Sequence, residues 1–505
     1  MNKAIVIGAG FGGIASALRL RAKGYSVQII DKCERLGGRA QVFEREGYKF
    51  DAGPTVITAP FLFNELFELF DKSREDYVEF KAVNPWYQFY FADGTRFNYG
   101  GSIENTLNEI AKFNPEDQKG YLDLVKKSQE IFDVGFTQLS DKPFHSVWSM
   151  LRQIPALLKL RSDRTVWQLV SRHISNEKLR QAFSVQPLLV GGNPFNTTSI
   201  YNLIHFLERK WGIHFAMGGT GALVDALGKL MTEVGIEIKL GTEVRQLVVE
   251  GKQITKAVLA DNSEVEADIF ISNADPLHLY RNMLSSRSSN LLAKLKTKRA
   301  KLSMGLFVLY FGTTKKYADV EHHTIWLGKR YKALLRDIFQ GDSLPDDFSL
   351  YVHRPTATDP SFAPDGHDSF YVLAPVPNLK ANIDWRAEGP VLMKRIIDAL
   401  ERTILPDLKK HIVHEFYMNP EDFQREYLSE AGAGFSIAPL FSQSAWFRFH
   451  NRGEGPSNLY VSGAGTHPGA GLPGVISSAK VVDRLVPSPI RQVETTQPRE
   501  VEVGV

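Results

Sequence analysis

The N-terminal segment carries the feature that most constrains the fold of this chain. The apolar run Ala4 to Ile7 is short and ends at a glycine, which is typical of a buried parallel strand. Three glycines follow at the spacing Gly8-x-Gly10-x-x-Gly13 and open a helical stretch. Gly8 permits a tight turn, Gly10 lets the backbone approach a pyrophosphate, and Gly13 lets the helix pack closely on the strand. The helix N-terminus would offer free N–H groups and its positive dipole end to phosphates.

A second strand supports this interpretation. The stretch YSVQII, at 25–30, reads as a strand and ends at Asp31. An acidic residue at this place accepts hydrogen bonds from the ribose hydroxyls of a dinucleotide. The alternative is a glycine turn in an ordinary strand–helix unit that binds nothing. The combined pattern predicts a dinucleotide-binding unit of an α/β fold.

The residues after the second strand indicate which dinucleotide binds. Gly37-Gly38-Arg39-Ala40 resembles the extended FAD fingerprint of the glutathione-reductase-like flavoproteins. Gly38 would let the backbone come near the cofactor, and Arg39 would neutralise pyrophosphate charge. The alternative for Arg39 is a surface salt bridge. In the same resemblance the stretch FDAGPTVIT, at 50–58, runs towards the flavin ring. FAD is therefore the expected cofactor.

Composition excludes several other classes of protein. The chain has 505 residues and a formal net charge of +3, which is too small to indicate nucleic acid as a partner. Its one cysteine, Cys33, permits no internal disulfide and no cysteine-rich metal site. No HExxH-type motif is present, so we expect no metal. No apolar run approaches the roughly 18 residues that span a bilayer, and the early lysine and apolar stretch belong to the nucleotide unit rather than to a signal peptide.

The order of elements predicts a discontinuous cofactor domain. We expect a glutathione-reductase-like FAD-binding Rossmann domain from residues 1–75, 212–280 and 455–486. An inserted α+β substrate and membrane-association domain would comprise 76–211 and 281–454, followed by a disordered tail at 487–505. Within this plan we expect a hairpin at 86–99 around Asp93-Gly94, with exposed-looking aromatic residues whose alternative is an ordinary core-facing hairpin. We also expect a helix at 221–234 and strands at 237–240, 244–248, 256–259 and 264–271.

A second glycine-rich loop lies near the C-terminus. GAGTHPGAGLPGV, from Gly463 to Val475, follows the strand NLYVSG and precedes a helix expected from about Gly474. This order repeats the strand–glycine–helix arrangement of the N-terminus. By resemblance to flavoproteins that carry such a loop, it is expected to close the cofactor site, with backbone N–H groups near Gly474 and Val475 as donors to the reduced ring.

Several longer motifs are similar to those of one family. They are GGRA (37–40), FDAGPTVIT (50–58), GGNPFNTTSIYNLIHFLE (191–208), GGTGALV (218–224), TDPSFAP (358–364), YVLAPVPNL (371–379), FSIAPLFSQSAWFRFHN (435–451) and the C-terminal loop. Up to about residue 485 the chain resembles the bacterial or fungal-type carotenoid desaturases, specifically their phytoene desaturase branch. The QSAWFR stretch and the C-terminal loop are the most specific of these motifs.

The resemblance implies an FAD-dependent oxidoreductase that inserts double bonds into phytoene. All-trans lycopene is the expected product, and earlier termination at neurosporene or zeta-carotene stays open. A C30 diapophytoene desaturase, a late-pathway 3,4-desaturase and a retinol saturase stay open as well. A non-catalytic isoprenoid escort would need a degraded cofactor site, and an amine oxidase would need a polar amine site. Oxygen or a membrane quinone would reoxidise the flavin.

The resemblance also implies site residues. Val244 would contact the adenine through its backbone, and Gly465 would permit close approach of the C-terminal loop. Arg152 and His467 are the candidate catalytic residues, with a surface role for Arg152 and a ring-positioning role for His467 as alternatives. Family members often carry an acid three residues before Arg152, where this chain has Ser149. That departure leaves the acid or base unidentified.

A hydrocarbon substrate implies an apolar tunnel and contact with a membrane. The stretch 146–174 interleaves Trp148, Trp167 and several leucines with basic residues such as Arg152, which suits an anionic membrane surface. The alternative is a helical pair packed inside the substrate domain. We expect a cytoplasmic protein held peripherally on the inner (cell) membrane, and a homo-oligomer is compatible with the sequence.

Overall fold

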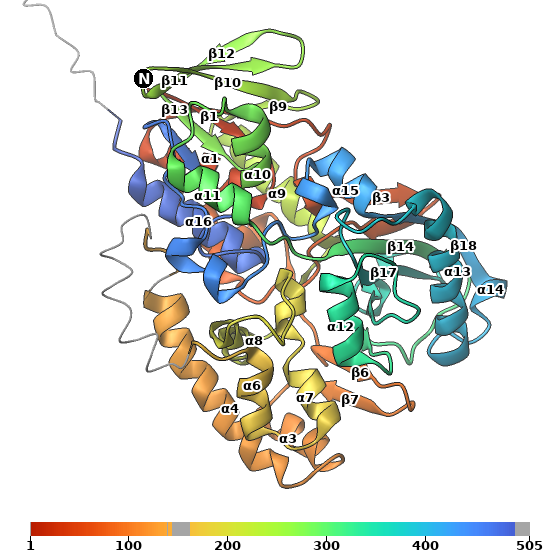
Figure 1. Cartoon of the computed structure of the whole chain (residues 1–505). Coiled ribbons are helices and arrows are strands. Elements are labelled where there is room, and N and C mark those ends of the chain that lie inside the picture. The colour runs from red at the N-terminus through yellow and green to blue at the C-terminus, as the bar shows by residue number, and fades with distance from the viewer. Residues whose placement is uncertain (1, 139, 144–161, 490–505) are drawn as a thin grey trace, which may run out of the picture.

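The computed structural model describes residues 2–138, 140–143 and 162–489 (Figure 1). Two large sheets and a helical part organise these residues. In Figure 1 the parallel sheet lies at the top, the larger sheet lies at the right, and the helices around α4 and α8 lie below. The predicted α/β class is confirmed.

The parallel sheet contains five strands in the order β19-β13-β1-β2-β9, and every neighbouring pair is parallel. Strands from the beginning, middle and end of the chain therefore lie side by side. The central strand is buried on both faces, which explains its apolar sequence. The bounds are Lys3–Ile7 (β1), Ser26–Ile30 (β2), Glu237–Lys239 (β9), Ile269–Ser272 (β13) and Leu459–Val461 (β19). The exact domain boundaries stay predictions.

Three helices pack with this sheet. They are α1 (Phe11–Lys23), α9 (Gly219–Glu233) and α16 (Leu472–Leu485), and α1 contacts both of the others. Leu18, Leu227 and Ile476 meet in one buried core. The N-terminal and C-terminal glycine loops each lead into one of these packed helices, so the core fixes where both loops lie.

One predicted strand is in fact two strands. The sequence predicts a continuous strand at 264–271, but β12 (Glu264–Glu266) and β13 belong to different sheets. β12 pairs antiparallel with β11 (Gln253–Leu259), which also pairs with β10 (Val244–Glu250). Between them, Asp268 accepts the N–H of Lys3 at 2.8 Å, which directs the chain into the parallel sheet. The expectation is wrong because apolar character alone does not show where a strand changes partners.

The second large sheet has seven strands in the order β18-β14-β17-β16-β15-β6-β7. The predicted hairpin around Asp93-Gly94 is confirmed as its edge, and Tyr87 and Phe89 are fully buried, so the alternative of a core-facing hairpin holds. Bounds are Tyr87–Tyr90 (β6), Arg96–Tyr99 (β7), Gly305–Thr313 (β14), His323–Trp326 (β15), Leu350–His353 (β16), Asp368–Val376 (β17) and Ile412–Met418 (β18). Two short ladders pair β3 (Val42–Arg45) with β4 (Tyr48–Asp51) and β5 (Phe80–Ala82) with β8 (His214–Ala216).

The remaining helices build the helical part or pack around the two large sheets. Those of the helical part are α3 (Ile103–Ala111), α4 (Asp117–Phe132), α6 (Val166–His173), α7 (Glu177–Phe183) and α8 (Leu203–Trp211). The others are α2 (Phe61–Glu68), α10 (Pro276–His278), α11 (Leu291–Arg299), α12 (Tyr331–Gln340), α13 (Trp385–Thr403), α14 (Leu408–His411) and α15 (Pro420–Tyr427). No helix in the described part of the chain is both long and apolar enough to cross a membrane.

Two sequence predictions fall largely outside the described residues. Residues 144–161, which include Ser149 and Arg152, and residues 490–505 of the expected tail are among those not described. At the start of the tail, the Pro487 carbonyl accepts the Tyr25 hydroxyl at 2.8 Å. At the end of the proposed membrane segment, Trp167 packs against Phe195 with ring centroids 4.7 Å apart. Membrane association of this segment stays a prediction.

Candidate functional site

The glycine turn after β1 has the geometry that its spacing predicts. Gly8 has a φ of +96°, which L side chains rarely adopt, and its N–H donates to the Ile30 carbonyl at 2.8 Å. A Cβ on Gly13 would lie 1.9 Å from the Gly8 carbonyl oxygen, so only glycine lets α1 approach the turn. Gly8 and Gly10 line a cavity, whereas Gly13 lies behind the turn and shapes it from there.

Asp31 lies at the end of β2 and also lines the cavity. Its carboxylate accepts the N–H of Ala9 and, at 2.7 Å, the N–H of Cys33. Burial raises the pKa of Asp31, and these backbone donors oppose that effect. A carboxylate oxygen accepts more than one hydrogen bond, so the group retains capacity for ribose hydroxyls.

Arg39 lines the same cavity and is partly buried, and among the described residues it forms no surface salt bridge. Its Nη2 donates to the Ser429 hydroxyl, and its Nε has no acceptor among the described residues. The backbone at Gly53 lies directly against that of Arg39, because a Cβ on Gly53 would lie 1.9 Å from the Arg39 carbonyl oxygen. Burial lowers the pKa of Arg39. A guanidinium whose buried Nε has no acceptor in the described structure fits an anionic ligand such as a pyrophosphate.

The C-terminal loop brings the N-terminus of α16 to the cavity. The helix begins at Leu472, with Pro473 in its first turn, two residues before the expected start. The expectation that Val475 donates to the cofactor is wrong, because its N–H donates to the Gly471 carbonyl at 2.9 Å inside the first turn. In the described structure the N–H groups of Leu472 and Gly474 have no acceptor, so these two are the available donors.

The glycines of this loop allow it to pack on the chain after β13. A Cβ on Gly463 would lie 2.4 Å from Asn273 Nδ2, and a Cβ on Gly465 would lie 2.4 Å from Pro276 Cδ. Both contacts hold the loop against the end of the parallel sheet. The close approach expected of Gly465 is therefore, in this structure, an approach to Pro276.

Arg448 fixes the loop from the other side. Its side chain is 1% exposed and donates to four backbone carbonyls. Nε reaches Thr466 at 2.9 Å and Nη2 reaches Ala464 at 2.6 Å, both within the loop. The remaining contacts join Nη1 to Gln443 and Nη2 to Ile437, each at 3.3 Å. The QSAWFR motif thus contributes a structural clamp on the C-terminal loop.

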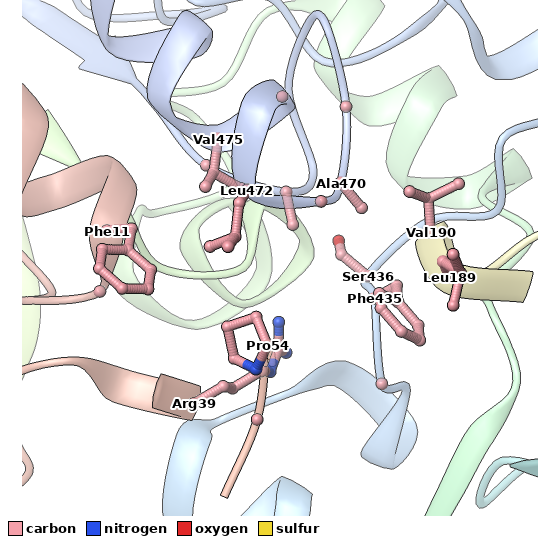
Figure 2. A pocket seen from close by; sticks show the side chains of 18 of the residues that line it. Phe11, Arg39, Pro54, Leu189, Val190, Phe435, Ser436, Ala470, Leu472 and Val475 are labelled. Carbon is pink, nitrogen blue, oxygen red and sulfur yellow. The ribbon is translucent and has the colours of Figure 1, made fainter. Parts of the chain in front are cut away.

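One cavity of about 560 Å³ connects these elements (Figure 2). Figure 2 shows Phe11, Arg39 and Pro54 from the N-terminal part, Leu472 and Val475 from α16, and Leu189, Val190 and Phe435 around the same open space. All predicted site residues except two line it. They are Gly8, Gly10, Asp31, Gly38, Arg39, Val244, Gly465, His467, Gly474 and Val475. Gly13 does not line it, and Arg152 lies outside the described residues.

Beyond the glycine loops the wall becomes apolar. The 3₁₀-helix η4 (Gln186–Val190), α8, α12 and the seven-stranded sheet supply it. The apolar residues of this wall include Phe136, Leu188, Leu189, Val190, Ile200, Leu207, Leu306, Ile325, Leu327, Leu335 and Leu373. A long hydrocarbon and a dinucleotide would therefore share one cavity, the hydrocarbon at this end and the dinucleotide at the glycine end.

His467 is the residue of the C-terminal loop that is predicted as a catalytic candidate, and it lines the cavity. It is 7% exposed, and its carbonyl accepts the Asn451 side-chain amide at 2.9 Å. Whether its ring positions the loop or transfers a proton stays a prediction.

Glu208 is a polar residue of the apolar wall that sequence reasoning missed. It is fully buried, and its Oε1 accepts the Tyr87 hydroxyl at 3.2 Å. Within the described residues its Oε2 has no hydrogen-bond partner. Burial raises the pKa of Glu208 to about 7. The one signal in the sequence was an acid beside Leu207 on the apolar face of a helix, which is costly unless the acid has a role.

Three buried histidines lie behind the same wall. One ring nitrogen from each of His322, His323 and His353 lies within 4.8 Å of the others, the one such group among the described residues. Hydrogen bonds hold these rings: His322 Nδ1 to Thr358 at 2.6 Å, His323 Nδ1 to Tyr351 at 2.8 Å and His353 Nε2 to Asp51 at 3.4 Å. Burial keeps the pKa of His322 and His323 well below the usual value, so both are neutral. The expected absence of a metal stays a prediction.

Comparison with known proteins identifies the family. The model of the flavin containing amine oxidoreductases matches residues 11–482. This chain belongs to that family. The protein is accordingly an FAD-dependent oxidoreductase, as the glycine motifs and Arg39 predict.

Within the flavin-containing amine oxidoreductases, its near relatives are phytoene desaturases. A lycopene-forming enzyme of Pseudescherichia vulneris is 47% identical over 96% of this chain and 99% of that protein. Another, from Pantoea ananas, is 45% identical over the same shares. A neurosporene-forming enzyme of Rhodobacter capsulatus is 40% identical, over 96% of this chain and 94% of that protein.

Solved structures support the same fold. A Methanosarcina mazei oxidoreductase covers 95% of this chain and 100% of its own, with a TM-score of 0.66 and 17% identity. The structure of putrescine oxidase bound to putrescine matches 96% of this chain and 98% of its own chain, with a TM-score of 0.64 and 13% identity. At this identity the likeness shows the fold alone.

Proposed function

We propose that this protein is a phytoene desaturase that converts phytoene to all-trans lycopene with bound FAD. The observation that carries the proposal is the single cavity in which the dinucleotide motifs continue into an apolar wall. Lycopene-forming relatives at 43 to 47% identity, matched over nearly their whole length, support the substrate and the product. The intact glycine turn, Asp31 and Arg39 argue against an isoprenoid escort.

The residues present fit FAD. Asp31 would hold the ribose, and Val244 would contact the adenine. Arg39 would hold the pyrophosphate, because its buried Nε is without an acceptor in the described structure. The N–H groups of Leu472 and Gly474 would face the pyrimidine end of the flavin. When bound, the flavin supplies the hydride acceptor that no side chain can provide.

The rest of the chain binds and aligns the hydrocarbon. Such a substrate has no polar handle, so its affinity must come from burial, at roughly 0.8 kcal/mol for each CH₂. Leu188, Leu207 and Leu335 offer that apolar surface from three separate elements. The same residues exclude water from the reacting carbons. Arg152 and His467 remain candidate catalytic residues of this proposal.

Expression in a host that accumulates phytoene tests the proposal. We expect the host to form lycopene, with the four additional double bonds visible in the absorption spectrum and confirmed by chromatography. Accumulation of neurosporene would instead favour the shorter reaction of the relatives at 40% identity. Unchanged phytoene, with the protein present and FAD bound, would refute the proposal.

A peripheral position on the cytoplasmic face of the cell membrane is part of the same proposal, with oxygen or a membrane quinone as electron acceptor. A surface other than the segment 146–174 supports it. On α11, Leu291 is 72% exposed and Leu295 is 40% exposed, next to exposed Lys294, Lys298 and Arg299. The adjoining 441–447 loop exposes Phe441 and Phe447, and Lys296 of α11 donates to the Arg448 carbonyl beside it. Apolar residues among cations suit an anionic bilayer surface.

Introducing negative charges into the exposed apolar residues tests this surface. Leu291→Glu combined with Phe447→Glu should lower co-sedimentation with anionic lipid vesicles at least about tenfold, because it replaces apolar contacts with like charge. Leu122→Glu combined with Val391→Glu is the matched control, since these residues are 43% and 49% exposed on other helices. Equal losses in both double variants would exclude the α11 surface.

A further inference from the structure

Glu208 occupies an unusual place for a carboxyl group. Helix α8 places Leu203, Leu207 and Glu208 together on the cavity wall, and Glu208 is fully buried there. A carboxylate among apolar side chains is unfavourable unless it is paired or neutral. Its presence on this wall therefore calls for an explanation in the chemistry of the cavity.

The groups around Glu208 leave one of its oxygens available. Oε1 is 3.2 Å from the Tyr87 hydroxyl, whereas Oε2 makes no hydrogen bond of good geometry among the residues that the structure describes. The Gln186 side chain also lies close enough to the carboxyl group to oppose the rise of its pKa. The neighbouring cation, Arg209, makes no ion pair with Glu208: it donates to Gly101 and Thr106 at 3.0 Å and lies 4.1 Å from the Trp86 ring centre. Its charge still opposes the rise of the pKa of Glu208.

The other titratable neighbours do not neutralise Glu208 either. His205 Nε2 donates to the Phe183 carbonyl at 2.6 Å, and burial lowers the pKa of His205 to about 4, so it is neutral. Tyr99 and Tyr121 face the group as neutral phenols whose pKa values burial raises. Burial therefore outweighs the opposing effect of the polar neighbours, and the pKa of Glu208 rises to about 7.

Contacts connect Glu208 with the part of the wall nearest the cofactor motifs. The Tyr87 ring centre is 5.9 Å from that of His323. His323 Nδ1 is 2.8 Å from the Tyr351 hydroxyl, which is 2.6 Å from the hydroxyl of Thr55. Thr55 belongs to the FDAGPTVIT stretch and lines the same cavity as Glu208. Glu208 is thus one end of a strip of polar contacts that reaches Thr55 on the same cavity wall.

We propose that Glu208 is the proton acceptor of the desaturation, an inference that rests on the proposed function. When bound, the flavin would supply the acceptor for one hydrogen together with its bonding electron pair. Glu208 accepts the hydrogen of the adjacent carbon as a proton on its carboxylate, and the electrons of that C–H bond form the new double bond. The substrate is oxidised and the flavin is reduced by two electrons.

The surroundings of Glu208 fit this role. A base works best when its pKa lies near the working pH, and this carboxyl is held there by burial. Glu208 belongs to the wall along which the polyene would pass, and an apolar environment strengthens its attraction to a developing carbocation. No water is needed to carry the proton away from the carbon.

Single-turnover kinetics with the holoenzyme and Glu208→Gln test the proposal. Phytoene in liposomes should bleach the flavin of the wild-type protein under anaerobic conditions, and the variant should do so at least about 100-fold more slowly. Flavin content and FAD affinity should be unchanged. Glu321→Gln is the control, because burial also raises the pKa of Glu321 but that residue does not line the cavity.

The pH profile separates proton transfer from a packing role. The wild-type rate should fall about tenfold per pH unit below pH 7, because the protonated carboxyl cannot accept a proton, and Glu208→Gln should lack this limb. Glu208→Asp should still lose rate below pH 7, but its maximal rate of flavin reduction should be lower than that of the wild type.

Stability gives a readout that does not depend on turnover. The folded pKa of about 7 exceeds the ordinary value of 4.5, so the neutral form stabilises the folded state below pH 4.5. That contribution is lost as the pH rises to about 7. The free energy of unfolding of the wild type should therefore fall over this range relative to that of Glu208→Gln. Because this holds without substrate, it also reports on Glu208 if the variant is poorly active.

Two results would overturn the inference. One is a Glu208→Gln enzyme that bleaches its flavin within about threefold of the wild-type rate at pH 8. The other is an acid limb that persists in this variant. If the wild-type protein itself fails to oxidise phytoene, the proposed function fails, and the stability experiment still decides whether Glu208 titrates near pH 7.

Discussion

Replacing Arg448 with methionine should remove FAD from the protein and lower its thermal stability. The buried guanidinium donates to four backbone carbonyls, two of them in the C-terminal loop. Methionine fills much of the volume but donates nothing, and each buried carbonyl without a donor costs about 1 to 3 kcal/mol. Methionine also removes the cost of burying a charged guanidinium, which offsets part of the cost of the unpaired carbonyls. We therefore expect about 3 kcal/mol of destabilisation.

The largest effect of Arg448→Met should be on the binding of FAD. Without the contacts to Ala464 and Thr466, the loop no longer holds the N-terminus of α16 in one position. We expect FAD affinity to fall at least about 100-fold, measured by flavin fluorescence during titration of the apoprotein. Arg452→Met is the matched control, because Arg452 is exposed on the same segment. An Arg448→Met protein that binds FAD normally would show that the clamp is not needed.

Gly13→Ala should prevent the nucleotide unit from folding correctly. The added Cβ would lie 1.9 Å from the Gly8 carbonyl oxygen, which belongs to the backbone and cannot rotate away. To relieve the overlap, α1 would have to move off β1 and out of the core that it shares with α16. We expect a destabilisation of at least about 4 kcal/mol and a colourless, poorly soluble protein.

A second glycine separates this steric effect from backbone strain. Gly251 has a φ of +61° and nothing within 4 Å of its would-be Cβ. Gly251→Ala should therefore cost only about 1 kcal/mol and leave the yellow colour unchanged. Chemical denaturation and the flavin absorbance of both purified variants measure the difference. Similar losses in the two variants would argue against the steric explanation for Gly13.

The sequence predicted the glycine end of the cavity well because its determinants are local. A strand, a turn that needs glycine at Gly8 and a helix that needs glycine at Gly13 lie next to one another in the chain. The same holds for the second strand that ends at Asp31 and for the loop before α16. Spacing along the chain then translates directly into geometry, and these residues line one cavity as expected, apart from Gly13 behind the turn.

Predictions failed where the partner of a group is distant in sequence. The stretch 264–271 divides between two sheets because Asp268 meets Lys3. Val475 uses its N–H inside α16, which depends on where that helix begins. In each case the residue type permits several outcomes, and only the long-range contact selects one.

By itself, then, the sequence determined the α/β class, the FAD motifs and the family, because these follow from short patterns whose spacing has one physical reading. The tertiary structure alone decided what the scattered polar residues do. Arg448 became a clamp because four carbonyls converge on it, and Glu208 became a cavity residue because α8 turns it towards the apolar wall. Burial, which changes both the pKa of a carboxyl and the cost of an unpaired donor, is a property of the folded chain and cannot be read from neighbours in the sequence.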